Sequence, residues 1–159
     1  MKTSACVEAP VDVVWTHLAR LDQIYLWTDA IHRSYVSGDC SAGVGAVRTC
    51  ELLGDRRLHE HIIAWDEGVS YTYESYDAPM MKLARNRWRV RAEGARTLVT
   101  SEAEVQFRGG PLGWLLGWLL VPLLRVLLPN PLAKFKFWVE NGRPFDGKAS
   151  KLPTPATIC

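Results

Sequence analysis

The sequence predicts an α+β domain in which a curved antiparallel sheet of about seven strands wraps around a long helix near the end of the chain. Three observations predict it. Apolar and polar residues alternate in six successive segments between residues 32 and 107, and short turns rich in glycine, aspartate and proline separate these segments. Two short helical patterns precede them, and a strongly apolar helical stretch follows. A twisted meander beside one apolar helix curls around it, because both then bury their apolar faces.

The expected elements follow one another in a simple order. A strand at 3–8 comes first, and two short helices at 11–19 and 22–31 follow it, with apolar residues three and four positions apart. The six later strands are expected at 32–38, 46–53, 57–65, 69–76, 83–92 and 96–107. A helical stretch then runs to about residue 141. Pro122, Pro129 and Pro131 interrupt it, so a fresh helical run is expected to start at Asn130-Pro131 and to end at Asn141-Gly142.

Size and composition support one globular domain. The chain has 159 residues, of which 48% are hydrophobic and 23% charged, and this excludes general disorder. The formal net charge of +2 gives no argument for nucleic acid, and no nucleic-acid partner is expected. We expect residues 1–143 to form the domain and the proline-containing residues 144–159 to form a flexible tail.

The cysteines and the first residues bear on cellular location. The chain contains four cysteines: Cys6, Cys40, Cys50 and Cys159. They form no C-x-x-C pair, and none stands beside a histidine at the spacing of zinc ligands, so we interpret them as buried or free thiols in a reducing compartment. The first residues lack the long apolar run of a signal peptide. The expected location is therefore the cytoplasm.

The apolar stretch 112–128 is close to the length of a membrane helix, which needs about 20 such residues. It is slightly short and contains Pro122 and Arg125, so the preferred interpretation is a helix surrounded by protein or ligand. Trp114 and Trp118 are four positions apart and share one helix face. That face either closes the interior or forms an exposed patch for transient membrane contact or for a partner subunit, such as a second copy in a homodimer.

Several short pieces of the chain, taken together, resemble a known family. They are the segment from Val7 to Trp15, Trp27, Gly43-Val44-Gly45-Ala46-Val47-Arg48, Glu60-His61-Ile62, Pro111-Leu112-Gly113 and Val139-Glu140-Asn141-Gly142. In this order, across residues 2–142, they resemble the START-like (SRPBCC) helix-grip proteins, above all the polyketide cyclase/dehydrase and lipid-transport family. The resemblance implies a cavity between the sheet and the long helix for a hydrophobic or amphipathic small molecule, lipid-like or polyketide-like. It implies no single chemistry, since such proteins include carriers, receptors and cyclases.

Strand alternation assigns side chains to the two faces of the sheet. The four arginines at alternate positions from Arg85 to Arg91 must form a solvated face, which leaves Asn86 and Trp88 inside. The same reasoning predicts these further inward residues: Val69, Tyr71, Tyr73, Val99, Ser101, Ala103, Val105 and Phe107. Glu102 and Glu104 then point outward, where they can pair with the arginines.

For Arg48 and Glu60 the alternation does not decide the face, and the resemblance favours both inside. Two buried charges need each other, a water molecule or a ligand, so these residues are the best candidates for orienting a polar group of the ligand. The alternative is an ion pair on the rim. The expected ligand-binding residues are Trp27, Arg48, Glu60, Tyr71, Tyr73, Asn86, Trp88, Trp114 and Trp118. Plain core packing is the other interpretation of the aromatic members.

Enzymatic activity stays open. An aldol-type cyclase or dehydratase would use Glu60 as the base, with Arg48 or a tyrosine hydroxyl as donor to the enolate. No nucleophile elbow, phosphate-binding loop or H-E-x-x-H motif is present, and no cofactor is expected. His59 and His61 share a strand face but lack a third ligand, so no metal is expected. We therefore predict a binder or carrier of a hydrophobic small molecule, with the cyclase and an interaction module built on the Trp-rich helix as alternatives.

Overall fold

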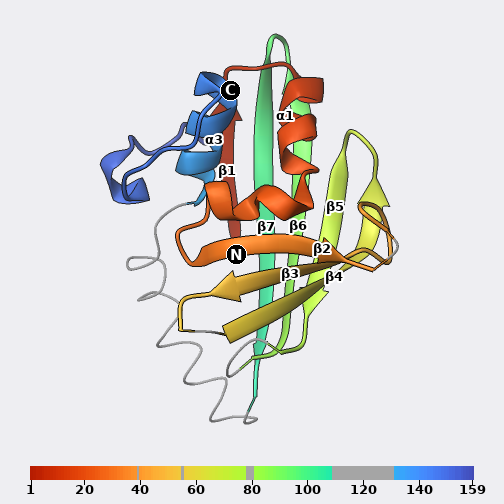
Figure 1. Cartoon of the computed structure of the whole chain (residues 1–159). Helices are drawn as coiled ribbons and strands as arrows, with labels where there is room; N and C mark the ends of the chain where they lie inside the picture. The colour runs from red at the N-terminus through yellow and green to blue at the C-terminus, as the bar shows by residue number, and fades with distance from the viewer. Residues whose placement is uncertain (39, 55, 78–80, 109–130) are drawn as a thin grey trace.

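The computed structural model describes residues 1–38, 40–54, 56–77, 81–108 and 131–159 of the chain (Figure 1). Seven antiparallel strands form one sheet in the order β1-β7-β6-β5-β4-β3-β2. The first strand of the chain therefore pairs with the last, and each remaining strand pairs with its neighbours in sequence. This is the antiparallel meander that the alternating segments predict, closed by the N-terminal strand.

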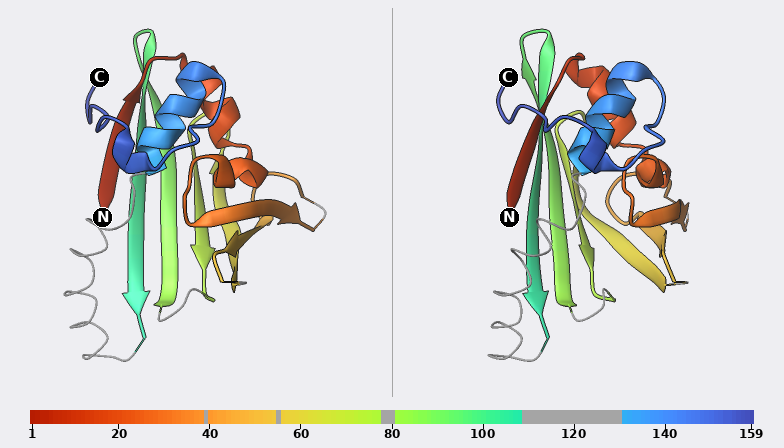
Figure 2. Two further views of the ribbon diagram at one scale, coloured as in Figure 1. Left: turned by 60° about the vertical axis from the view of Figure 1, so that its left-hand side comes forward. Right: turned by 90° about the vertical axis from the view of Figure 1, so that its left-hand side faces the viewer.

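The bounds of the elements are close to those expected. The strands are β1 (Lys2–Val7), β2 (Ile31–Ser37), β3 (Val47–Leu52), β4 (Arg56–Asp66), β5 (Ser70–Ser75), β6 (Met81–Glu93) and β7 (Arg96–Phe107). The helices are α1 (Val11–Leu18), η1 (Leu21–Leu26), α3 (Pro131–Asn141) and η2 (Ala149–Lys151). Figure 2 shows α1, η1 and α3 on the same side of the sheet, with β2 and β3 curling toward that side.

The second expected helix, at residues 22–31, is wrong in type and in length. Its residues form the six-residue 3-10 helix η1, and Ile31 already begins β2. Leu21 and Ile24 are three positions apart and both are buried, which suits the three residues per turn of a 3-10 helix. The backbone N–H of Ile31 then donates to the carbonyl of Thr28 at 3.2 Å, and this turn leads directly into β2.

Helix α3 covers the sheet with an apolar face and has the expected ends. Leu132, Phe135 and Trp138 recur three positions apart and are buried. The helix starts at Pro131, as the Asn-Pro pair predicts. Gly142 ends it with a φ of 66°, and its N–H donates to the carbonyl of Trp138 at 2.9 Å. The expected apolar segment 112–128 lies outside the described residues, and none of the described helices is long and apolar enough to cross a membrane.

The interpretation of all four cysteines as free thiols is wrong for two of them. Cys6 in β1 and Cys159 form a disulfide, while Cys40 is an exposed free thiol and Cys50 a buried one. The pair is 153 positions apart, so spacing gave no signal for it; the end of the chain has to return to β1 first. Disulfides are rare in reducing compartments, so the cysteines no longer support a cytoplasmic location.

Candidate ligand-binding site

Arg48 and Glu60 form a buried ion pair on the inner face of the sheet. They are direct cross-strand partners on β3 and β4, and Arg48 Nε lies 2.5 Å from Glu60 Oε2. The two side chains are 1% and 5% exposed, so the alternative of a rim ion pair is wrong. Strand pairing explains the contact, because opposed residues of an antiparallel pair point to the same face.

The pair has two further buried neighbours. The Sγ of Cys50 donates to Glu60 Oε2 at 3.3 Å, and the guanidinium carbon of Arg48 lies 5.0 Å from the centre of the Tyr73 ring. Burial, and next the negative charge of Glu60, raise the pKa of Cys50, so this thiol keeps its proton. Burial is the largest single effect and lowers the pKa of Arg48, but interactions with Glu60 and then with Tyr71, Tyr73 and Cys50 together outweigh it, so the net pKa is raised. The guanidinium therefore stays charged.

Tyrosines and a tryptophan line the floor beside the ion pair. Tyr71 is 0% exposed and stacks on Trp65 and Tyr73, with ring centres 5.5 and 6.4 Å apart. Burial raises the pKa of both tyrosine hydroxyls, which are therefore neutral. The inner floor is thus flat and apolar, with hydroxyl groups at its edges.

A short polar chain continues from Tyr73 across the sheet. Asn86 Nδ2 donates to the Tyr73 hydroxyl at 3.5 Å, and the Ser101 hydroxyl donates to Asn86 Oδ1 at 3.0 Å. Tyr73, Asn86 and Ser101 stand on β5, β6 and β7, so these contacts cross three adjacent strands. These contacts fix the orientation of the Asn86 amide.

Trp27 and Trp88 meet between the sheet and the helices. Their rings are edge to face with centres 5.3 Å apart, and Trp27 lies equally close to Phe135 of α3. Both tryptophans are almost fully buried, at 2% and 3% exposed. Trp27 follows η1 directly, so this short helix positions it against α3.

Five buried polar side-chain atoms have no hydrogen-bond partner among the described residues: Arg48 Nη2, the hydroxyls of Tyr71 and Thr28, and the indole nitrogens of Trp27 and Trp88. Leaving one buried polar group unsatisfied costs about 1–3 kcal/mol. The arginine and tryptophan nitrogens can only donate, whereas the two hydroxyls can donate or accept. Three of these five atoms therefore need an acceptor.

The structure brings together seven of the nine expected ligand-binding residues. Trp27, Arg48, Glu60, Tyr71, Tyr73, Asn86 and Trp88 all lie in this interior. Trp114 and Trp118 lie outside the described residues. Val69, expected inside, is 42% exposed in the turn before β5, because the strand begins only at Ser70. Cys50 was not among the expected ligand-binding residues, although it lies two positions after Arg48 and so shares its face of β3.

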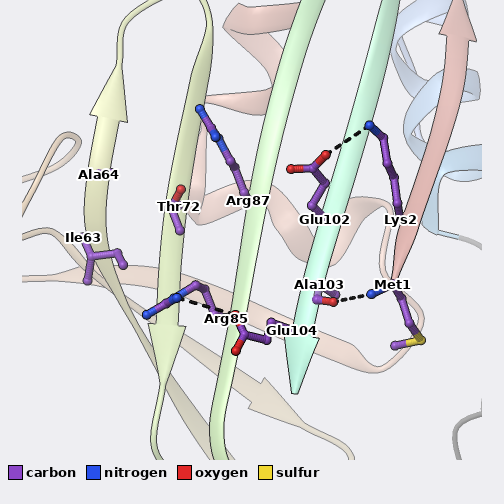
Figure 3. A pocket seen from close by; sticks show the side chains of 10 residues that line it. All are labelled: Met1, Lys2, Ile63, Ala64, Thr72, Arg85, Arg87, Glu102, Ala103 and Glu104. Carbon is purple, nitrogen blue, oxygen red and sulfur yellow. Dashed lines mark hydrogen bonds and ion pairs between the residues drawn. The ribbon is translucent and has the colours of Figure 1, made fainter. Parts of the chain in front are cut away.

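The outer face of the sheet is the solvated face that the arginine row predicts. An open hollow of about 560 Å³ lies there (Figure 3). Arg85 reaches Glu104 at 3.5 Å across it, as expected, whereas Glu102 pairs with Lys2 at 3.1 Å rather than with an arginine. Exposed ion pairs of this kind contribute little binding specificity. The buried cluster on the opposite face is the stronger candidate site.

The histidines of β4 lie on the outer face. His59 Nδ1 lies 2.6 Å from Asp77 Oδ2, and His61 is exposed beside the Tyr76 ring. The part of the chain that the structure describes contains no group of three metal-ligating side chains.

A curved seven-stranded antiparallel sheet that packs around helices, with a polar cluster enclosed between them, defines the START-like helix-grip class. The profile of the family described as polyketide cyclase / dehydrase and lipid transport matches residues 1–136, and the chain belongs to this family. No curated protein matches the chain in sequence.

Solved structures confirm the fold at low sequence identity. A START superfamily protein from Mycobacterium smegmatis is 14% identical with a TM-score of 0.66, and the match covers 89% of this chain and 97% of that one. Norcoclaurine synthase from Thalictrum flavum, in complex with dopamine and hydroxybenzaldehyde, is 16% identical with a TM-score of 0.64, covering 89% and 83%. Ara h 8.0201 is 13% identical with a TM-score of 0.65, covering 87% and 95%.

Proposed function

We propose that the protein binds a hydrophobic or amphipathic small molecule between the sheet and α3, as a carrier or receptor. One observation carries this proposal: the apolar interior that encloses the Arg48–Glu60 ion pair also contains buried donors that have no partner in the described part of the chain. Native proteins satisfy nearly all buried polar groups. A bound molecule that brings acceptor atoms would remove the deficit, and its apolar body would gain about 25 cal/mol for each Å² buried.

The charge balance narrows the polar group of this molecule. Arg48 and Glu60 neutralise each other, and the buried Cys50, Tyr71 and Tyr73 keep their protons, so the cluster is uncharged as a whole. A carboxylate would bring an uncompensated negative charge into this interior, which is costly. An uncharged carbonyl, as in a ketone, ester or lactone, accepts from Arg48 Nη2 and the Tyr71 hydroxyl without that cost. We therefore favour a carbonyl-bearing ligand.

The family supports a ligand of this kind without naming one. Its description joins polyketide chemistry with lipid transport, and both substrate classes are largely apolar with oxygen atoms. The similar norcoclaurine synthase holds dopamine and hydroxybenzaldehyde, two small aromatic molecules. At its low identity that protein supports the size and general nature of the ligand rather than its identity.

Binding of a matched pair of probes tests the proposal. We expect 2-dodecanone to quench tryptophan fluorescence and to bind more tightly than dodecanoate, whose charge is not compensated. Tyr71→Phe removes one hydroxyl and keeps the ring, and it should weaken ketone binding about 5- to 10-fold, the value of one hydrogen bond. Thr72→Val on the outer face is the control and should leave binding unchanged. Failure of both probes to bind, together with native mass spectra free of co-purified ligand, would refute the proposal.

A cyclase or dehydratase activity is the second candidate, and one arrangement favours it. The Glu60 carboxylate lies on the same face as Arg48 Nη2 and the Tyr71 hydroxyl, which have no partner among residues 1–38, 40–54, 56–77, 81–108 and 131–159 and could donate to a developing enolate oxygen. Glu60 would then remove a proton beside the carbonyl. With a poly-ketone substrate, Glu60→Gln should abolish turnover while binding persists, and unchanged turnover would exclude the role.

A further inference from the structure

Strand β1 lies at one edge of the sheet, and the end of the chain covers it. The sheet order begins with β1, so one side of this strand has no neighbouring strand. The backbone N–H of Cys6 donates instead to the carbonyl of Ala156 at 2.8 Å. Figure 2 shows the last residues of the chain crossing beside β1. An uncovered edge strand offers free N–H and C=O groups to other chains, so the covering residues protect this edge from pairing with another chain.

The covering segment, residues 152–159, is called the strap here. Three contacts fix it to the sheet: the Cys6–Cys159 disulfide, the bond from Cys6 to Ala156, and a bond from Arg96 Nη2 to the Cys159 carbonyl at 2.7 Å. Pro155 is buried. Two single hydrogen bonds hold a segment only weakly. The disulfide is therefore the strongest attachment of the strap to β1.

The other end of this part of the chain is held on α3. The ring of Phe145 packs edge to face on Phe137, with centres 5.1 Å apart, and the Arg143 guanidinium lies over Phe137 at 5.8 Å. The chain thus leaves α3, packs on it, crosses to β1 and is joined there covalently. The disulfide closes a covalent ring that starts at Cys6 near the end of β1, includes α3 and returns at Cys159.

The two cysteine residues differ in exposure. Cys6 is 3% exposed, whereas Cys159 is partly exposed. An external thiolate therefore reaches the bond from the side of Cys159. The attachments of β1 to the rest of the fold do not depend on the strap: six residues of β1 pair with β7, and Lys136 Nζ of α3 donates to the Cys6 carbonyl at 2.8 Å.

We propose that Cys6–Cys159 is a thiol-exchange site, at which a dithiol reductant releases the strap from β1 while the sheet stays folded. A thiolate of the dithiol attacks Cys159 Sγ, the bond to Cys6 Sγ breaks, and Cys6 leaves as a thiolate that takes up a proton. The second thiol of the reagent then displaces Cys159 and closes the reagent's own disulfide. The protein gains two electrons and two protons, and the dithiol is oxidised by two electrons.

Thiol labelling tests the first half of the proposal. Purified protein is oxidised in air, freed of any reductant, and alkylated with iodoacetamide under native conditions. We expect a single label, at Cys40, since Cys50 is buried. After dithiothreitol, Cys159 should be labelled as well, and faster than Cys6. Labelling of Cys6 or Cys159 in the oxidised sample would show that the disulfide does not form and would overturn the proposal.

Hydrogen exchange tests the second half. Reduction should speed exchange at the Cys6 amide and in the strap at least tenfold, while residues 86–91 of β6 stay protected and exchange far more slowly than the strap. The variant Cys159→Ser should exchange in this way without reductant, and Cys40→Ser should respond as the natural chain does. Unchanged exchange in the strap would contradict the proposal. Equally fast exchange in β6 would contradict it too, because the disulfide would then hold the whole fold together.

Discussion

Trp15 of α1 and Trp65 of β4 share one acceptor: the indole N–H groups donate to the two oxygens of Glu67, at 2.7 Å each. Their rings also meet edge to face, 5.3 Å apart. Glu67 stands in the turn between β4 and β5, so this arrangement ties the first helix to a hairpin far along the chain. It satisfies both indole donors, in contrast to those of Trp27 and Trp88 in the interior.

The shared acceptor predicts a pH dependence of stability. The hydrogen bonds from Trp65 and Trp15 lower the pKa of Glu67 below its ordinary value. A lowered pKa in the folded state means that the stabilisation is present above the unfolded-state pKa and is lost as the pH falls through the folded-state pKa. Glu67→Gln has no carboxylate at this position, so its unfolding free energy should fall less below about pH 5 than that of the natural protein. Urea unfolding from pH 3 to 7 measures this, and parallel curves for both proteins would argue against it.

The Arg48–Glu60 pair predicts an asymmetry between single and double substitutions. Arg48→Met leaves Glu60 buried without its partner and should cost about 3–5 kcal/mol of unfolding free energy. The double variant Arg48→Met, Glu60→Leu removes both charges and should be more stable than the single one by at least about 2 kcal/mol. Urea unfolding provides the measurement. If the free-energy losses of Arg48→Met and Glu60→Leu add up to the loss of the double variant, the two charges do not interact.

Loss of the disulfide should lower global stability while the native fold persists. A cross-link between residues 153 positions apart restricts the unfolded chain strongly. Cys159→Ser should lower the unfolding free energy by about 2–5 kcal/mol, and dithiothreitol should lower that of the natural chain by a similar amount. Cys40→Ser, which removes an exposed free thiol, serves as the control. A variant as stable as the oxidised natural chain would contradict this expectation.

Gly142 should be hard to replace at the end of α3. Its φ of 66° is a left-handed conformation that side chains with a Cβ disfavour, and no atom within 4 Å crowds the position. Gly142→Ala should therefore cost about 1 kcal/mol through backbone strain alone. Gly142→Asn should cost less, since asparagine tolerates this conformation better. Thermal unfolding of the two variants distinguishes strain from steric conflict, which would penalise asparagine more than alanine.

The sheet could be predicted from the sequence because period-two alternation is a local signal. The arginines from Arg85 to Arg91 fixed the outer face of β6, and the same alternation within the neighbouring strand placed Tyr71 and Tyr73 inside. Local alternation could not place Arg48 and Glu60, since a charged residue lies on each face of their strands. Only the family resemblance placed them inside.

Other features depend on contacts between distant segments. The disulfide needs the last residue of the sequence to reach β1, and nothing near either cysteine indicates that path. For the helix expected at 22–31, a local signal was present but did not distinguish between two kinds of helix. Its apolar spacing of three fits both an α-helix and the 3-10 helix that forms, and the strand that starts at Ile31 decides between them.

A ketone bound in the interior should accept hydrogen bonds from Arg48 Nη2 and the Tyr71 hydroxyl, and carbon-13 NMR of 2-dodecanone labelled at its carbonyl carbon tests this most directly. In complex with the natural protein the carbonyl resonance should lie downfield of its position in an apolar solvent, because hydrogen bonds polarise the carbonyl group. Tyr71→Phe should remove part of this shift, whereas the control Thr72→Val should keep it. A bound ketone whose carbonyl resonance stays at its position in the apolar solvent would contradict the account.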